Sequence, residues 1–306
     1  ALLRPVLRMS SIGKRLKFLL PAQWRNLLEL APSSMPPPAR VARTGVIQAQ
    51  GQKRARIAFL TGCAQQVLGP GINDSSVRTL TRLGAEVVVP PALGCCGSLP
   101  YHMGERRHSL KLMRRAVLAL SEELETGGLD AIAVSTSGCG PAMREYGHIF
   151  RDDPDLAEKA TAVAGIVKDI SEVISDLGLG ETRRELGLRG AYHDACSLQH
   201  AQRVRRQPRE LLTEVGCTVV EVPEAHICCG SAGTYSMLEK EYASRLRERK
   251  VAHIEQTEAD VVVAGNLGCI EQIAQGTKLP VVHTIELLDW GTGGPVPDVL
   301  KRRGLL

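Results

Sequence analysis

The stretch Leu-Gly-Cys-Cys-Gly-Ser at residues 93–98 returns at residues 226–231 as His-Ile-Cys-Cys-Gly-Ser. Each copy belongs to a longer pattern, in which 31 residues separate an earlier cysteine from the Cys-Cys pair and a fourth cysteine follows. The two quartets are Cys63, Cys95, Cys96 and Cys139, and Cys196, Cys228, Cys229 and Cys269. The first three cysteines recur at an offset of 133 residues and the fourth at 130. Such a period indicates a duplicated unit and hence two similar domains.

A segment of different composition precedes the two units. Residues 1–28 contain six basic residues and no acidic one, interleaved with apolar residues, and a proline-rich stretch follows at 31–38. We therefore expect a basic amphipathic segment and linker over 1–52, a first cysteine-rich domain over 53–185 and a second over 186–306. A basic amphipathic segment suits an anionic membrane surface or a partner protein, and a solvated linker helix is the alternative.

Composition narrows the class of protein. The chain is 43% hydrophobic and 23% charged, and it has no apolar run near the ~18 residues of a spanning helix. Aromatic residues make up only 3%, so the basic residues lack aromatic neighbours and we exclude nucleic-acid binding. With no secretory signal recognised, we expect a cytoplasmic protein, or one peripheral on the inner face of the cytoplasmic membrane, whose thiols stay reduced.

Short apolar segments alternate with helix-like segments, which predicts an α/β fold with small parallel sheets flanked by helices. The expected strands are residues 56–61, 87–89, 131–135, 190–193, 219–222 and 261–264. The expected helices include residues 75–83, 105–124 and 240–254. Each patterned cysteine follows a strand, and ligands gather beyond the carboxyl ends of parallel strands. We therefore expect each quartet to converge at one sheet edge.

Four gathered thiolates suit zinc, copper(I) or an iron–sulfur cluster. Structural zinc typically uses two close C-x2-4-C pairs, and this chain has no C-x2-C. Adjacent cysteines suit a larger cluster better than a single ion, and four cysteines are the usual complement of a [4Fe–4S] centre. The spacing thus favours iron–sulfur over zinc, a redox dithiol or plain core cysteines. The ninth cysteine, Cys217, is expected to be an ordinary buried residue.

The residues around the cysteines carry a more specific resemblance. The pattern is similar to the cysteine-rich CCG domains of heterodisulfide reductase, anaerobic glycerol-3-phosphate dehydrogenase and lactate-utilisation iron–sulfur proteins. It most resembles the glycolate oxidase iron–sulfur subunit, over about residues 55–290. The segments that carry this likeness are Thr-Ser-Gly-Cys-Gly at 136–140, Glu-Tyr-Gly at 145–147, Cys-Ser-Leu-Gln-His-Ala-Gln at 196–202, Cys-Cys-Gly-Ser-Ala-Gly-Thr-Tyr at 228–235 and Asn-Leu-Gly-Cys at 266–269.

The resemblance implies an electron-transfer subunit of an oxidoreductase acting on the CH–OH group of a 2-hydroxy acid such as glycolate. A flavin-containing partner subunit with FAD would oxidise the substrate, and electrons would pass through this chain toward a quinone or another acceptor. The eight patterned cysteines would hold one or two iron–sulfur clusters of the [4Fe–4S] type, with no catalytic residue in this chain alone. Gly97 and Gly230 would let the backbone approach the cluster.

Two departures from the family pattern matter. Many members close each repeat with C-x2-C, but Cys139 is followed by Gly-Pro-Ala and Cys269 by Ile-Glu-Gln. This predicts ordinary four-ligand centres, or a site completed by a non-cysteine ligand. An N-terminal ferredoxin-like domain is also expected in the glycolate oxidase subunit, and its C-x2-C-x2-C-x3-C-P runs are not in this sequence, which begins with Ala1. We therefore expect the chain to be part of a longer subunit.

Two other functions remain open from the residues. One is a thiol–disulfide redox subunit like that of heterodisulfide reductase, and the other is a zinc-stabilised interaction module. His193, His200 and His226 flank the second quartet, where a ligand or proton-relay role is the alternative to an ordinary hydrogen-bonded structural role.

Overall fold

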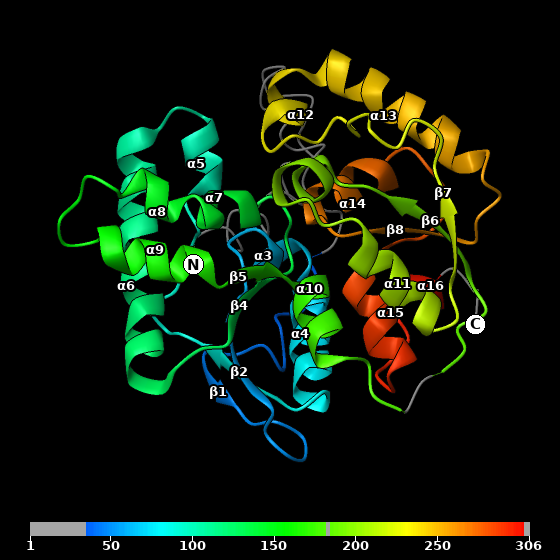
Figure 1. Ribbon diagram of the computed structural model, residues 1–306. Helices are drawn as coiled ribbons and strands as arrows, with labels where there is room; N and C mark the ends of the chain where they lie inside the picture. Colours follow the sequence, from blue (N-terminus) through cyan, green and yellow to red (C-terminus); the bar gives the residue numbers. More distant parts are fainter. Residues whose placement is uncertain (1–34, 182–183, 303–306) are drawn as a thin grey trace.

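Two sheets, each covered by helices, make up the computed structural model, which describes residues 35–181 and 184–302 (Figure 1). The α/β class with two small, mainly parallel sheets is confirmed. The basic segment 1–28 lies outside the described residues. Among the described residues, no helix combines the length and the apolar character that a membrane span needs.

The first sheet has the strand order β1-β3-β2-β4-β5. Its strands are β1 (Gly45–Ile47), β2 (Ala55–Leu60), β3 (Ala85–Val89), β4 (Ala131–Val134) and β5 (Val167–Asp169). The helices of this half are α3 (Gln65–Leu68), α4 (Pro70–Arg82), α5 (Ser98–His102), α6 (Arg106–Gly127), α7 (Gly140–Arg144), α8 (Tyr146–Ile149), α9 (Ala157–Gly165) and α10 (Ile170–Leu177). All strand pairs are parallel except β1 with β3. Strand β1 thus adds an antiparallel edge from within the range expected to be linker.

The second sheet has the order β7-β6-β8-β9 and is parallel throughout. Its strands are β6 (Arg189–His193), β7 (Thr218–Glu221), β8 (Val261–Ala264) and β9 (Val281–His283). The helices of this half are η2 (Ser197–Gln202, a π-helix), α11 (Arg206–Glu214), α12 (Tyr235–Leu238), α13 (Lys240–Glu255), α14 (Leu267–Ala274), α15 (Thr284–Gly291) and α16 (Asp298–Arg302). The six strands expected from the sequence are therefore all present, as β2, β3, β4, β6, β7 and β8.

The central strands β2, β4 and β8 are buried on both faces, which explains why they read as continuous apolar runs. Along β2, Ile57 and Phe59 join one hydrophobic cluster, whereas Ala58 and Leu60 join another with residues of α6 and α9. The alternation follows from the two-residue period of a strand. Helices on two sides therefore fix the sheet, and its carboxyl edge is left for the cysteine loops.

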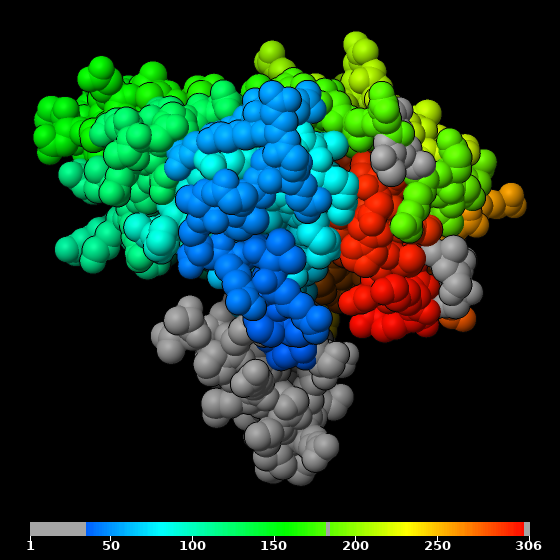
Figure 2. Space-filling model, turned by 90° about the horizontal axis from the view of Figure 1, so that it is seen from below, coloured from blue at the N-terminus to red at the C-terminus, as the bar shows by residue number. Residues whose placement is uncertain are grey.

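The two halves share one core. Helices α4 and α10 of the first half and α11 and α15 of the second contribute to a single buried cluster that reaches both sheets. Figures 1 and 2 show α4 and α15 side by side, in cyan and red. Across this contact, the Arg78 guanidinium donates to the buried Asp289 carboxylate over 2.8 Å. The duplicated units thus pack against each other through a common layer of helices.

Candidate metal centres at two sheet edges

The eight patterned cysteines lie in loops or helix starts beyond the carboxyl ends of adjacent strands. In the first half, Cys63 follows β2, the Cys95-Cys96 pair follows β3 and Cys139 follows β4. The second half repeats this arrangement, with Cys196 after β6, the Cys228-Cys229 pair after β7 and Cys269 after β8. Because β2 lies between β3 and β4, and β6 between β7 and β8, each set of loops opens at one edge.

The thiols of each quartet lie next to one another in a row. The first chain of contacts runs Cys63, Cys95, Cys96, Cys139. The second runs Cys196, Cys228, Cys229, Cys269. The expected convergence is therefore observed, in the same order at both sites. The role of these thiols as metal ligands stays a prediction.

Each quartet extends from the surface into the core. Cys63 and Cys196 are exposed, whereas Cys96 and Cys229 are buried, at 3% and 2% exposure. The buried members belong to the hydrophobic clusters beside their sheets. A centre held by such a group would be shielded from water on one side and reachable on the other.

Crowding of the thiols shifts their ionisation. A hydrogen bond to Cys95, burial and the nearby charge of Cys95 raise the pKa of Cys63. Cys196 has its pKa raised in the same way by Cys228. The hydrogen bond from Cys229 lowers the pKa of Cys269. Four thiolates cannot gather here without a compensating cation, whereas a bound metal deprotonates the thiols that coordinate it.

The glycine after each cysteine pair is required by the backbone. Gly97 and Gly230 have positive φ angles of 78° and 88°. A Cβ on Gly97 would lie 2.6 Å from the Met113 side chain of α6, and one on Gly230 would lie 2.4 Å from the Ala243 carbonyl oxygen of α13. Glycine therefore lets each turn pack against a helix. That the backbone at Gly97 and Gly230 approaches an iron–sulfur cluster stays a prediction.

Both glycine N–H groups also face sulfur. Gly97 donates to the Cys95 Sγ over 3.4 Å, and Gly230 donates to the Cys228 Sγ over 3.3 Å. Such N–H···S bonds stabilise negative charge on sulfur. The two turns thus present the same donor to the same member of each quartet.

Side chains to which the sequence pattern assigned no role fix the first turn in place. Tyr146 donates its hydroxyl to the Cys96 carbonyl over 2.7 Å, and Ser109 donates to the Gly97 carbonyl over 2.8 Å. Tyr146 falls in the quoted 145–147 segment, but only the folded chain reveals its partner 50 residues away. These bonds tie the turn to α6 and α8.

The loops of the two quartets meet each other. The Ser137 N–H donates to the Gly265 carbonyl over 3.3 Å, and the Ser137 hydroxyl lies 2.9 Å from that of Ser197. Gln202 donates to the Ser137 carbonyl over 3.0 Å. Because Ser197 directly follows Cys196 and Ser137 stands two residues before Cys139, the two sites are held by adjoining loops.

The ninth cysteine and the three histidines near the second quartet differ in how far they are buried. Cys217 packs in the shared core at 2% exposure, and burial raises its pKa to about 11, which confirms an ordinary buried cysteine. His200 and His226 are exposed, whereas His193 is buried at 1% exposure beside the second quartet.

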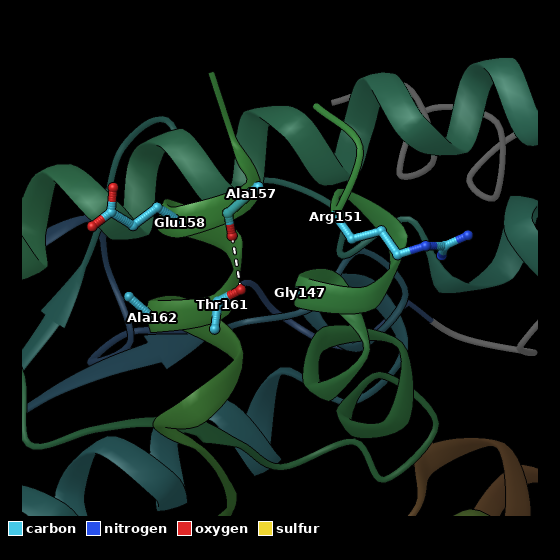
Figure 3. A pocket seen from close by; sticks show the side chains of 6 residues that line it. All are labelled: Gly147, Arg151, Ala157, Glu158, Thr161 and Ala162. Atoms are coloured by element: carbon cyan, nitrogen blue, oxygen red, sulfur yellow. Dashed lines mark hydrogen bonds between the residues drawn. The ribbon is translucent and has the colours of Figure 1, made fainter. Parts of the chain in front are cut away.

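A hollow between α8 and α9 lies away from the cysteines (Figure 3). Its lining includes Arg151 and Glu158, whose charged groups point away from each other, and Thr161, which donates its hydroxyl to the Ala157 carbonyl of its own helix. The side chains shown in Figure 3 do not converge on a common point, so we assign this hollow no role.

Comparison with known proteins agrees with this geometry. The CCG cysteine-rich domain family matches residues 57–144 and 190–274. The chain is 33% identical to the glycolate oxidase iron-sulfur subunit of Escherichia coli, over 92% of this chain and 66% of the relative. It is 32% identical to the probable glycolate oxidase iron-sulfur subunit of Bacillus subtilis, over 78% of this chain and 55% of the relative. The chain thus spans less than two thirds of these relatives.

The chain is also similar to one relative that is covered over nearly its whole length and to one solved structure. Lactate utilization protein A of Bacillus licheniformis is 30% identical, over 76% of this chain and 99% of the relative. A hypothetical protein from Helicobacter pylori shares the fold, with a TM-score of 0.53 at 11% identity, over 86% of this chain and 53% of that structure. The expected resemblance is therefore confirmed, and the chain belongs to the CCG cysteine-rich domain family, with one copy of the domain at each quartet.

Proposed function

We propose that this chain is an iron–sulfur electron-transfer subunit of a 2-hydroxy-acid oxidoreductase that acts on glycolate. The observation that carries the proposal is the pair of like-built quartets of contacting thiols. Its relatives named as glycolate oxidase iron-sulfur subunits support the assignment. Catalysis of the hydroxy-acid oxidation belongs in this proposal to a flavin-containing partner subunit that carries FAD.

The donor set fits the proposed cofactor. Each site offers four sulfur atoms, which are soft ligands, and a backbone N–H directed at one of them. We assign Cys63, Cys95, Cys96 and Cys139 to one [4Fe–4S] centre, and Cys196, Cys228, Cys229 and Cys269 to another. When bound, such centres accept and release single electrons. The protein's own part is to hold the ligands, bury one side of the site and stabilise charge on sulfur.

Exposed apolar side chains near the quartets support a docking surface for the flavin-containing partner. Helix α5 starts directly after the first Cys-Cys-Gly turn and exposes Leu99, and Met103 follows it at 52% exposure. Helix α12 lies just after the second turn and exposes Met237 and Leu238. A Cβ on Gly233 would lie 3.2 Å from the Leu99 side chain, so the two patches adjoin. Large exposed apolar patches mark interaction sites.

The electron acceptor is assigned from the amino-acid sequence of residues 1–28. Residues 1–28, basic and interleaved with apolar residues, suit the anionic inner face of the cytoplasmic membrane. We therefore propose a peripheral position there and a membrane quinone as the acceptor.

The test follows electrons through the isolated, anaerobically purified chain. Reduction with dithionite should bleach its visible absorbance, and a short-chain ubiquinone should restore it. A colourless protein, or absorbance that does not respond to reduction, would contradict the proposal. Reoxidation by an organic disulfide, with no reaction toward the quinone, would instead favour the thiol–disulfide reductase class.

A further inference from the structure

We infer that His193 binds the metal of the second quartet through a ring nitrogen, beside the sulfur atoms of Cys229 and Cys269. The inference rests on the proposed function, and it adds that the two centres have different ligand sets. Only the second would carry a nitrogen ligand.

The position of the imidazole is the first observation. His193 is the last residue of β6 and is 1% exposed. One ligand atom from each of His193, Cys229 and Cys269 lies within 4.8 Å of the others. No other group of histidine, cysteine or acidic side chains in the described part of the chain meets this condition. All three side chains are buried, so they lie on the water-shielded side of the second quartet.

Strand geometry explains why the imidazole is directed to the thiols. Side chains alternate along β6, so His193 shares a face with Ala191 and lies opposite Tyr192. Ala191 belongs to the cluster that contains Cys229 and Cys269, whereas Tyr192 belongs to the core shared by the two halves. The fold therefore places the histidine on the side of the quartet.

The second observation is that neither ring nitrogen of His193 meets an oxygen or nitrogen partner among the described residues, and that the polar group next to the ring is the Cys269 thiol. The matching case is His283, also 1% exposed, whose Nε2 lies 2.7 Å from the Ser135 carbonyl and whose Nδ1 accepts from the Ile285 N–H over 3.1 Å. Both ring nitrogens of this buried structural histidine therefore have a backbone partner. Burying an imidazole with no oxygen or nitrogen partner is costly, and coordination of a metal shared with the Cys269 sulfur would satisfy it.

The third observation is the difference between the repeats. His193 stands three residues before Cys196, and the residue three before Cys63 is Leu60. Leu60 is 2% exposed and lies in the apolar cluster with Cys96. The first site therefore offers sulfur alone where the second offers sulfur and nitrogen. Because the second centre alone would gain a neutral nitrogen ligand beside its thiolates, we expect the two centres to differ in reduction potential.

The test measures nitrogen bound to the reduced centre by pulsed EPR. Protein made with natural-abundance histidine and with histidine labelled with nitrogen-15 is purified anaerobically, and its iron and sulfide are counted first. We expect a strong hyperfine coupling that changes with the histidine label. This comparison uses the wild-type chain and needs no variant.

Variants assign the coupling to one residue. In His193→Leu, which carries the side chain found at the matching place of the first repeat, the strong coupling should vanish and the second centre's potential should shift. The first centre's signal should persist. The exposed histidines provide controls, because His200→Leu and His226→Leu should leave both the coupling and the potentials unchanged.

Several results would overturn the inference. Loaded protein without a label-dependent coupling would do so, and so would the weak coupling of a histidine that only donates a hydrogen bond to sulfur. A strong coupling that persists in His193→Leu would also contradict it. These outcomes leave the proposed function standing. A wild-type chain that holds zinc or no iron would instead overturn the proposed function, and the inference with it.

Discussion

At the scale of single residues, Gly230 tests how the cysteine turns are built. We expect Gly230→Ala to lower the free energy of unfolding by about 2–5 kcal/mol, because left-handed strain costs about 1–2 and overpacking about 1–3 kcal/mol. The added Cβ would meet the Ala243 backbone oxygen at 2.4 Å, where little can move. Urea denaturation measures the loss.

Gly104 is the matched control for this substitution. It has φ of 81°, and a Cβ there would meet nothing within 4 Å. Gly104→Ala should therefore cost only the strain of the left-handed backbone, about 1–2 kcal/mol. Equal losses for the two variants would show that the close approach to α13 is unimportant.

His283 and Glu286 should give opposite pH dependences. Burial lowers the pKa of His283 from 6.5 to about 4 and raises that of Glu286 from 4.5 to about 7. Between pH 4 and 6.5 the unfolded chain binds a proton at His283 that the folded chain does not, so this group makes stability rise with pH. Between pH 4.5 and 7 the folded chain keeps a proton on Glu286 that the unfolded chain releases, so this group makes stability fall.

Glu286→Gln should therefore expose the contribution of His283. The free energy of unfolding of this variant should rise more steeply from pH 4.5 to 6.5 than that of the wild type, by at most about 1.4 kcal/mol per pH unit. Glutamine can still accept the His283 N–H, so the helix cap is kept. Urea denaturation at several pH values measures both slopes, and parallel slopes would refute this assignment.

The sequence predicts the position of a single residue only where the spacing between residues determines that position. The intervals between Cys63, Cys95 and their repeats predict which thiols converge, because each follows a strand of one sheet. No interval predicts the hydrogen bond of Tyr146 or the position of the His193 ring beside Cys229 and Cys269. Those features depend on packing between segments far apart in the chain.

At the scale of elements, the contact between α4 and α15 depends on one buried acid. Asp289 is fully buried and binds Arg78 and Arg82, whose side chains are 25% and 23% exposed. Asp289→Ala should lower the free energy of unfolding by about 2–3 kcal/mol, less than the ~3–5 of a fully buried pair because both arginines reach solvent. Thermal or urea denaturation measures the effect.

Glu210→Ala is the control, because Glu210 pairs with Arg206 on the surface of α11, where their side chains are 51% and 84% exposed. Such a pair contributes about 0.3–0.5 kcal/mol. If Asp289→Ala were no more destabilising than this variant, the account of the interface between the halves would be wrong.

The sequence predicts the longer strands and misses β1, β5 and β9, which have only three residues each. Such short segments lack a period and are defined by pairing at a sheet edge. A sequence signal nevertheless follows one of these strands, β5. Asp169 with Glu172 forms the capping box that starts α10, and Asp followed three residues later by Glu can be read from a sequence. His283 with Glu286 forms the capping box of α15, but histidine is not among the preferred N-cap residues.

At the scale of the whole molecule, the repeat predicts two similar units but not how they pack. The core shared by α4, α10, α11 and α15, and the loop contact at Ser137, join segments that have no common sequence signal. Each quartet is nevertheless completed within its own half. We therefore expect two separate centres in a molecule whose halves share one core.

The most direct test of that claim counts iron and acid-labile sulfide per chain after anaerobic purification, in the wild type and in three cysteine variants. We predict about eight of each in the wild type, from two [4Fe–4S] centres. Cys96→Ser and Cys229→Ser should each lose about half, and Cys217→Ser, which alters the buried cysteine outside both quartets, should lose none. Zinc in place of iron, or an iron content unchanged by Cys96→Ser and Cys229→Ser, would contradict the account.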